Sequence, residues 1–286
     1  MKALAPLLAL LLAGPAAAAP PPPALAAPAF APTRFSVEVV GSGPDVILIP
    51  GLTASKEVWR GTLAAVPGYR YHLIQVAGFA GAPARGNREG PIVAPLAEEI
   101  ARYIEANRLR RPAVVGHSMG GTLALMLAAR HPRLVGKAMV VDMLPQPAAL
   151  LGTSAENIRG FADLLESVSG TAFGQSLIDS AVRMFGNAAP ANAKSDRDVV
   201  ARAAHELALT DLTPELPHIR APLTIVYASP AASLAATADG VYRRAYADDP
   251  AAALVRIDGS GHMIMADQPG RFAEELRRFL SSSPGT

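Results

Sequence analysis

The sequence contains no cysteine among its 286 residues. This absence excludes disulfide bonds, a thiol nucleophile and a lipid anchor on an N-terminal cysteine. Charged residues make up only 17% of the chain and aromatic residues 5%, while 50% of the residues are hydrophobic. Intrinsically disordered chains have the opposite balance, with high charge and little apolar material. The composition therefore predicts a globular protein with a large apolar core that folds without cross-links.

The sequence also lacks a block of like charges and an apolar run long enough to span a membrane. Lys and Arg total 26 against 24 Asp and Glu, which gives a formal net charge of +2. So small an excess, without a basic cluster, argues against a nucleic-acid partner. The apolar stretch at residues 3–13 is shorter than the ~20 residues that cross a bilayer. We therefore expect no nucleic-acid partner and no stable membrane insertion of the mature protein.

The N-terminus has the three parts of a secretory signal. Lys2 supplies the positive region, residues 3–13 the apolar region, and small residues with A-x-A cleavage options follow. We predict a signal peptide at residues 1–26, with cleavage after Ala18 as a second option, and an Ala/Pro-rich leader at residues 27–33. An uncleaved anchor is the alternative. The expected location is the periplasm or the medium.

From Arg34 onward, short apolar runs alternate with amphipathic stretches. Helical periodicity is clear at residues 91–107, where apolar residues recur every four positions. Strands are expected at residues 35–40, 45–49, 71–76, 113–115, 137–141, 223–227 and 253–257. Such alternation predicts one α/β domain over residues 34–286, with a mostly parallel central sheet and helices on both faces.

The alternation stops at about residues 144–216, where only helical signals occur. Ser195 with Asp198 fits an N-cap signal for a helix over residues 198–209. Apolar residues are frequent in this segment, and we expect them to pack on the core or to line a pocket: Phe161, Leu164, Leu165, Phe173, Leu177, Ile178, Met184 and Phe185. The segment is predicted to be a helical insertion into the α/β domain.

Ser118 stands in the segment Gly116-His117-Ser118-Met119-Gly120, after a predicted strand and before a predicted helix. Glycine on both sides of a serine permits a sharp strand-to-helix turn that exposes the hydroxyl. A tight turn without chemistry is the alternative interpretation. Ser118 is the candidate nucleophile, and we expect His117 to have a structural role.

A serine hydroxyl becomes a good nucleophile only when a base takes its proton. His262 follows the last predicted strand in a glycine-rich loop, at the carboxyl ends of the strands, where ligands bind in open α/β sheets. The other five histidines lie beside the nucleophile, in a strand, at a helix end, or within or just after the insertion: His72, His117, His131, His205 and His218. His262 is therefore the candidate base.

Residues 35–280 resemble the α/β-hydrolase superfamily. The motifs that carry the resemblance are Ile49-Pro50-Gly51-Leu52, Gly116 to Gly120, Ile219-Arg220-Ala221-Pro222 and Gly261-His262. Pro-Gly-Leu in place of the commoner His-Gly is similar to an exported bacterial serine-esterase-like subgroup. The resemblance implies the α/β-hydrolase fold, a helical cap at about 144–216, and an oxyanion hole made of the backbone N–H groups of Leu52 and Met119. It implies no metal and no organic cofactor.

The acid that orients the base is missing from its commonest place in this superfamily. The loop after the strand at 223–227 reads Ala228-Ser229-Pro230-Ala231-Ala232-Ser233 and holds no carboxylate. Asp142, at the end of the strand at 137–141, occupies an alternative position known in the superfamily, and we predict that it is the acid. Asp239 is the rival, although it also fits the start of a helix at 239–246. Asp267, before Pro269, is expected to cap the last helix.

These residues predict a serine hydrolase that cleaves uncharged carboxylic esters of small to medium size through an acyl-enzyme intermediate. The same residues could serve thioesters, lactones, carbon–carbon hydrolysis or perhydrolysis. A non-catalytic binding protein of the same fold is a different class, and the empty acid loop motivates it. The expected partner is a small ester-like molecule, while the natural substrate and the oligomeric state stay open.

Overall fold

The computed structural model describes residues 30–168, 171 and 194–282. The predicted signal peptide and residues 27–29 of the predicted leader lie outside these ranges. So do five of the apolar residues expected in the insertion, namely Phe173, Leu177, Ile178, Met184 and Phe185.

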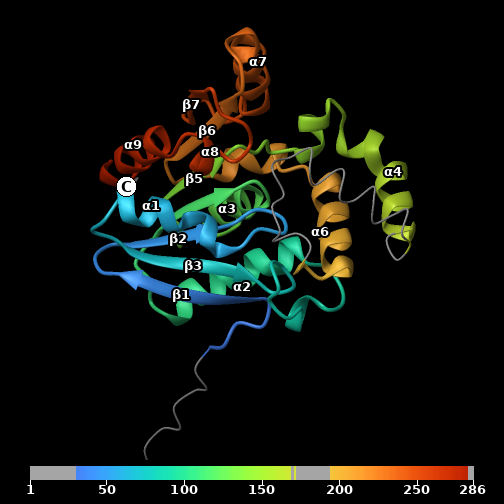
Figure 1. The fold of residues 1–286 in the computed structure, drawn as a ribbon, viewed down its shortest axis with the longest axis horizontal. Helices are drawn as coiled ribbons and strands as arrows, with labels where there is room; N and C mark the ends of the chain where they lie inside the picture. The colour runs from blue at the N-terminus through green and yellow to red at the C-terminus, as the bar shows by residue number, and fades with distance from the viewer. Residues whose placement is uncertain (1–29, 169–170, 172–193, 283–286) are drawn as a thin grey trace, which may run out of the picture.

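Seven strands form one sheet in the order β1-β3-β2-β4-β5-β6-β7 (Figure 1). β1 pairs antiparallel with β3, and the other neighbouring strands are parallel. The strands are β1 (Phe35–Gly41), β2 (Asp45–Ile49), β3 (Arg70–Val76), β4 (Ala113–His117), β5 (Lys137–Val141), β6 (Leu223–Ser229) and β7 (Ala253–Asp258). The predicted mostly parallel sheet is confirmed, and each strand matches its expected range to within two residues.

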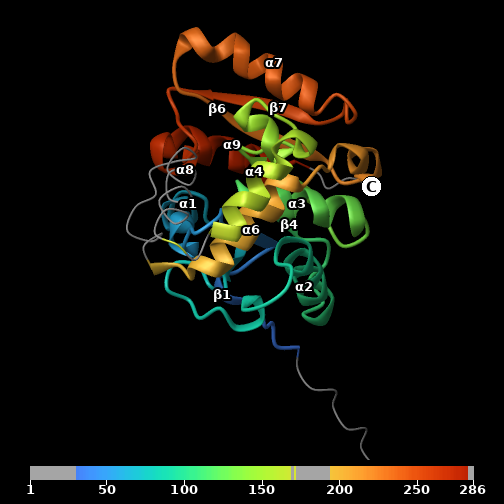
Figure 2. The ribbon, with the colours of Figure 1, turned by 90° about the vertical axis from the view of Figure 1, so that its right-hand side faces the viewer.

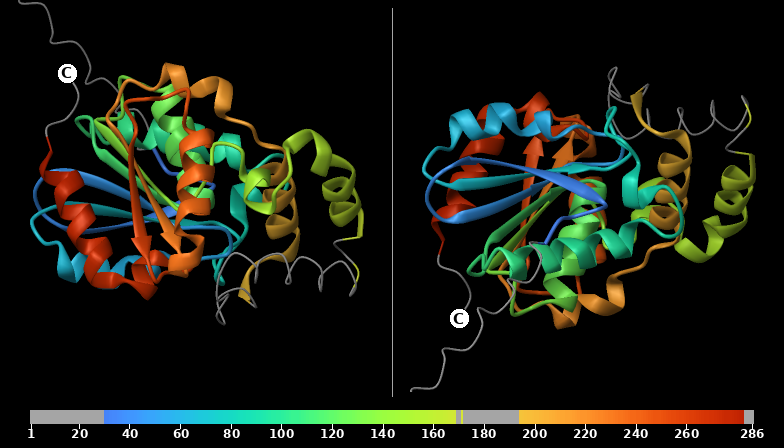
Figure 3. Two further views of the ribbon diagram at one scale, coloured as in Figure 1. Left: turned by 90° about the horizontal axis from the view of Figure 1, so that it is seen from above. Right: turned by 90° about the horizontal axis from the view of Figure 1, so that it is seen from below.

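Helices cover both faces of this sheet (Figure 3). One face carries α2 (Val93–Ala106), α3 (Met119–Arg130) and α7 (Ala235–Ala245), and the other carries α1 (Arg60–Ala65) and α9 (Pro269–Ser281). Alternate residues of a strand enter the two apolar clusters, because successive side chains of a strand point to opposite faces. In β2, Ile47 and Ile49 pack on the α2 and α3 side, while Val46 and Leu48 pack on the α9 side.

Between β5 and β6 the described chain is helical and lies beyond the carboxyl ends of the parallel strands (Figures 1 and 2). Its elements are η3 (Pro147–Leu151), α4 (Ala155–Val168), α6 (Arg197–Leu209) and η5 (Thr213–His218). Glu206 of α6 accepts hydrogen bonds from the N–H groups of Ile92 and Val93 at 2.7 and 2.8 Å. α6 therefore caps the start of α2, whose first N–H groups have no partner within their own helix.

Two expectations for this segment are wrong. Phe161 and Leu164 on α4 are 53% and 54% exposed, so these two side chains are not packed on the core. α6 is capped by Asp196, whose Oδ1 accepts from the N–H groups of Asp198 and Val199. Ser195, the expected cap, instead accepts a 2.9 Å hydrogen bond at Oγ from the N–H of Ala80.

The contacts of the domain begin before Arg34. The N–H and the hydroxyl of Thr33 donate to Glu99 of α2 at 2.9 and 3.0 Å. Phe30 packs against the core, with the Arg102 guanidinium 6.0 Å from its ring centroid. Residues 30–33, which the sequence assigns to the leader, thus lie against α2. Every helix of the described ranges is too short or too polar to cross a membrane.

Candidate active site

Ser118 occupies the sharp turn between β4 and α3. Its backbone has φ 54° and ψ −122°, a left-handed conformation that residues with a side chain rarely adopt. The turn is tight because backbone meets backbone: a Cβ on Gly116 would lie 1.9 Å from the carbonyl oxygen of Gly120. A Cβ on Gly120 would lie 2.2 Å from the carbonyl oxygen of Ile49. Only glycine fits these two positions, which is the physical reason for the G-x-S-x-G pattern.

His262 lies in the loop after β7, and several hydrogen bonds hold that loop. Asp267 accepts from the Gly261 N–H at 2.9 Å, and the Gln268 side chain donates to the Gly259 carbonyl at 2.8 Å. α9 begins after Gln268 without a side-chain cap, so the expectation that Asp267 caps this helix is wrong. Asp267 belongs to α8 (Ile264–Asp267) and stabilises the backbone next to His262 instead.

His117, the neighbour of Ser118, contacts His262 directly. Its Nε2 donates to the His262 carbonyl at 2.9 Å, and the two ring centroids are 4.6 Å apart. Burial, with a smaller contribution from His262, lowers the pKa of His117 from 6.5 to about 3, so its ring is neutral at neutral pH. The structural role expected for His117 thus takes a specific form: it ties the turn at Ser118 to the loop of His262.

Asp142 follows β5 and is hydrogen-bonded to His262, with 2.7 Å between Asp142 Oδ2 and His262 Nδ1. Its other oxygen, Oδ1, accepts from the Ala228 N–H at 2.9 Å and from the Tyr242 hydroxyl at 3.0 Å. Burial raises the pKa of Asp142, but these donors, His262 first among them, outweigh burial and lower the pKa below 3.8. The carboxylate is therefore ionised in its buried place.

Asp239, the rival acid, is bound elsewhere. It lies within α7 rather than at the start of a helix, so the expected helix start is wrong. Its two oxygens accept from the Tyr227 hydroxyl at 2.7 Å and from the Arg256 guanidinium at 2.6 Å. Arg256 also contacts Asp258, at the end of β7. These bonds attach α7 to β6 and β7, and it is Asp142 that contacts His262.

The two N–H groups expected to form the oxyanion hole flank Ser118. A Cβ on Gly51 would lie 3.0 Å from Ser118 Cβ, so the chain at Gly51 and Leu52 runs directly beside the serine. This chain makes a turn in which the Ala54 N–H donates to the Gly51 carbonyl at 3.1 Å, and the Leu52 N–H lies outside that bond. Met119 is the first residue of α3, where N–H groups have no partner within the helix. The chain at Gly51 thus lies beside Ser118, and the role of the two N–H groups stays a prediction.

Tyr242 is the site contact that sequence reasoning missed. It is 4% exposed and lies in α7, a hundred residues along the chain from Asp142. A tyrosine on the buried face of a helix has the same pattern as ordinary core packing, so no motif could reveal its hydroxyl contact. Trp59 is fully buried against Phe272, with ring centroids 6.2 Å apart, and belongs to the core.

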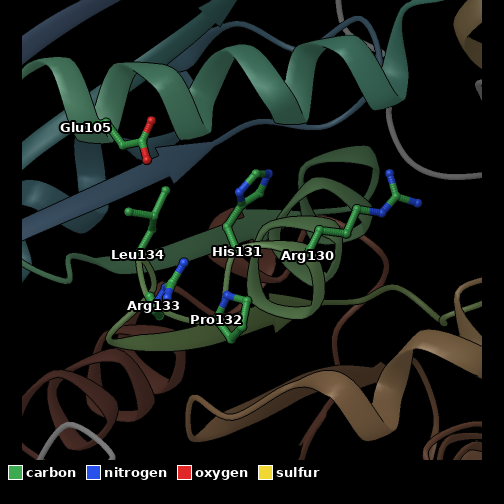
Figure 4. Close-up of a pocket in the computed structure, with 6 residues that line it drawn as sticks. All are labelled: Glu105, Arg130, His131, Pro132, Arg133 and Leu134. Atoms are coloured by element: carbon green, nitrogen blue, oxygen red, sulfur yellow. The ribbon is translucent and has the colours of Figure 1, made fainter.

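A surface hollow of about 450 Å³ lies at the far end of α3 from Ser118 (Figure 4). α3 has 12 residues, which at 1.5 Å per residue separates its ends by roughly 17 Å. Two of the polar side chains of the hollow are paired outside it, Arg130 with Glu215 at 2.7 Å and His131 with Glu98 at 3.0 Å. Elsewhere in the described ranges, no three His, Asp or Glu side chains gather in a way that could hold a metal ion.

Comparisons with known proteins agree with this fold. The model of the Alpha/beta hydrolase family matches residues 46–275, and the chain belongs to this family. An enol-lactonase from Burkholderia xenovorans LB400 superposes with a TM-score of 0.69 at 16% identity, covering 87% of this chain and 97% of that one. An esterase from Exiguobacterium antarcticum superposes with a TM-score of 0.69 at 21% identity, covering 87% and 96%. The α/β-hydrolase fold is confirmed.

Among curated proteins, the chain is similar to pimeloyl-[acyl-carrier protein] methyl ester esterases of several bacteria. That of Aromatoleum aromaticum is 28% identical over 247 residues, which cover 79% of this chain and 94% of the relative. That of Aeromonas hydrophila subsp. hydrophila is 34% identical over 111 residues, which cover 38% of this chain and 42% of the relative. The chain thus spans less than half the length of the Aeromonas relative.

Proposed function

We propose that this protein is a serine hydrolase that cleaves uncharged carboxylic esters of small to medium size, with Ser118 as nucleophile, His262 as base and Asp142 as acid. The observation that carries the proposal is the 2.7 Å hydrogen bond between Asp142 and His262, in the loop that His117 ties to the turn of Ser118. A buried carboxylate on one nitrogen of an imidazole, next to a serine in a strained turn, is the arrangement of a catalytic triad.

In the first step, the Ser118 hydroxyl attacks the ester carbonyl while His262 takes its proton. Because His262 Nδ1 donates to Asp142, the Nε2 atom is left as the base. The negative charge that forms on the carbonyl oxygen is held by the N–H groups of Leu52 and Met119. Losing one such donor costs about 3 kcal/mol of barrier in related chemistry.

In the second step, His262 returns the proton to the leaving alcohol, and an acyl group stays on Ser118. Water then attacks this acyl-enzyme with His262 again as base, which releases the acid and restores the hydroxyl. Asp142 stabilises the imidazolium in both steps. The lowered pKa of Asp142 supports this role, because only an ionised carboxylate can stabilise the imidazolium.

The helical segment between β5 and β6 is proposed to be a cap that limits the entry of water and substrate. The position of α4 and α6 beyond the carboxyl ends of the strands supports this proposal (Figure 2). Ser118 and Asp142 follow β4 and β5 at the same edge of the sheet. The name of the Aromatoleum relative, a methyl ester esterase, supports an ester as the substrate class.

Labelling by a fluorophosphonate probe tests the proposal. The wild-type protein is expected to react, and Ser118→Ala to lose labelling entirely. Ser281→Ala, an exposed serine on α9, is the control that keeps full labelling. A folded wild-type protein that does not react would contradict the proposal and favour a binding protein of the same fold.

A series of p-nitrophenyl esters with increasing acyl length tests the substrate class. We expect the highest kcat/KM for short to medium acyl chains, with lactones and thioesters of the same acyl group turned over more slowly. A preference for lactones or thioesters would agree with the proposed triad but contradict the proposed substrate class.

Export is a separate proposal, which rests on residues 1–26 and on the Pro-Gly-Leu motif that is similar to an exported subgroup. Expression of the full chain in a Gram-negative host is expected to yield a periplasmic protein that begins after Ala26 or Ala18. N-terminal sequencing of the periplasmic fraction measures this, and an uncleaved N-terminus in the membrane fraction would favour an anchor.

A further inference from the structure

Asp142 reaches His262 across a strand that separates them. β6 lies between β5, which Asp142 follows, and β7, which His262 follows. The backbone of Asp142 is left-handed, with φ 54°, and its N–H donates to the Val226 carbonyl of β6 at 2.8 Å. A carboxylate that must extend over a neighbouring strand from a strained backbone needs contacts that fix its direction.

Two donors provide such contacts at Asp142 Oδ1. One is the Ala228 N–H at 2.9 Å, which lies at the end of β6 where the commoner acid position is empty. The other is the Tyr242 hydroxyl at 3.0 Å, the only side chain besides His262 that donates to Asp142 among the described residues. With both acceptor sites of Oδ1 occupied, rotation of the carboxylate would break two hydrogen bonds. Oδ2 is therefore kept toward His262.

The Tyr242 ring is itself held in place. It stacks on Tyr227 of β6, with ring centroids 4.2 Å apart and 17° between the ring planes. Tyr227 in turn donates to Asp239, which Arg256 of β7 also binds. The bonds of Asp239 to Tyr227 and Arg256 thus attach α7 to β6 and β7. The Tyr242 hydroxyl of the same helix donates to Asp142. Asp239, the rival for the acid, serves this attachment.

We propose that Tyr242 is a positioning residue of the reaction, which orients Asp142 toward His262 and sets how strongly the carboxylate attracts the imidazolium. This inference rests on the proposed function. Because the hydroxyl donates to Asp142 Oδ1, it withdraws negative charge from the carboxylate. The groups that face Asp142 are His262 from the loop after β7, Tyr242 and Tyr246 from α7, and His117 from β4.

Tyr242→Phe removes one hydroxyl without changing the ring, and Tyr246→Phe is a matched control. Tyr246 is also buried at the end of α7, but its hydroxyl donates to the backbone carbonyl of Met143 at 2.8 Å. We expect kcat for p-nitrophenyl acetate to fall about five- to tenfold in Tyr242→Phe with KM nearly unchanged, and to stay near the wild-type value in Tyr246→Phe. The acid limb of the kcat/KM profile should move to higher pH in Tyr242→Phe, because the carboxylate holds the imidazolium more strongly.

A second measurement does not depend on turnover. The proton between His262 Nδ1 and Asp142 Oδ2 is expected to give a strongly downfield proton NMR signal. Its chemical shift should change in Tyr242→Phe and stay in place in Tyr246→Phe. Should Tyr242→Phe not fold, a fluorinated tyrosine at position 242 keeps the bond and donates more strongly, and the acid limb should then move to lower pH.

The outcomes separate this inference from the proposed function. Suppose that the wild-type protein reacts with fluorophosphonate, and that Tyr242→Phe and Tyr246→Phe have the same kcat, acid limb and proton shift. This result would overturn the role of Tyr242 and leave the proposed function in place. A wild-type protein that does not react would overturn the proposed function, while the proton shift would still report whether Tyr242 acts on the Asp142–His262 pair.

Discussion

At the scale of the residue, Ser118 and Asp142 share an unusual backbone. Both have φ 54°, and they follow the adjacent parallel strands β4 and β5. Left-handed backbone costs of order 1 kcal/mol for residues with a side chain, although aspartate tolerates it better than most. In each case the conformation turns a side chain out of the strand direction at the carboxyl edge of the sheet. The surrounding hydrogen bonds hold this strain in the folded state.

Substitution of the two candidate acids distinguishes them. We expect Asp142→Asn to lower kcat about 10³- to 10⁴-fold, because an amide can donate to His262 Nδ1 and so favour the wrong tautomer. Asp239→Asn should change kcat less than about threefold, since its bonds to Tyr227 and Arg256 attach α7 to the sheet and do not contact His262. Steady-state kinetics on p-nitrophenyl acetate measure both variants. A larger loss of kcat in Asp239→Asn than in Asp142→Asn would identify Asp239 as the acid.

At the scale of the element, the turn between β4 and α3 depends on backbone contact between α3 and β2. The Cβ of Gly120→Ala would meet the Ile49 carbonyl at 2.2 Å, and neither backbone can move without disturbing the sheet. We expect this change to lower the free energy of unfolding by about 3 kcal/mol or more.

Gly160→Ala is the matched control for that change. Gly160 lies within α4, and an added Cβ there would meet nothing within 4 Å. Alanine in a helix is favoured over glycine by roughly 0.5–1 kcal/mol, so this variant should be neutral or slightly more stable. Urea denaturation measures both variants, and equal effects would show that the clash at Gly120 is relieved by movement of α3.

The insertion shows how two helices of one segment differ in attachment. α6 caps the start of α2 through Glu206 and meets the core at Gly78, where an added Cβ would lie 2.8 Å from Val199. α4 packs on α6 (Figure 1). It carries the exposed Phe161 and Leu164. The firm attachment to the α/β domain thus runs through α6.

At the scale of the whole molecule, buried histidines make stability depend on pH. Burial is the first cause that lowers the pKa of His117 from 6.5 to about 3, and it also lowers that of His72 despite its contact with Asp45. Between pH 6.5 and about 3, His117 binds a proton in the unfolded chain but stays neutral in the folded protein. The free energy of unfolding should therefore fall as the pH drops below about 6.5, by about 1.4 kcal/mol per pH unit and per proton.

The carboxylate of Asp142 acts in a lower pH window. Its pKa is lowered below 3.8, so the stability that it contributes is present above that pH and is lost only below it. Urea denaturation over a series of pH values measures the slope, and His117→Gln should reduce it by about one proton because the amide does not titrate. A slope unchanged by His117→Gln would show that this imidazole is accessible to protons in the folded state.

The sequence by itself determined the α/β-hydrolase fold, the seven strands to within two residues, and the turn at Ser118. The strands and the turn are visible in the sequence because a strand is a short apolar run and the turn is a contiguous pentapeptide. Helix caps were predicted less well, because the carboxylate of Asp267 and the hydroxyl of Ser195 had a choice of N–H partners. Asp267 bonded to Gly261 in the preceding loop, and Ser195 bonded to Ala80, which lies 115 residues away in the chain.

The tertiary structure alone decided which carboxylate contacts His262. Asp142 and Asp239 both had a plausible place along the chain, but only the order of β5, β6 and β7 brings one of them within 2.7 Å of the imidazole. The same holds for Tyr242, whose contact with Asp142 joins residues a hundred positions apart. Such contacts depend on how the strands are ordered and how α7 lies on them, and no sequence spacing records that geometry.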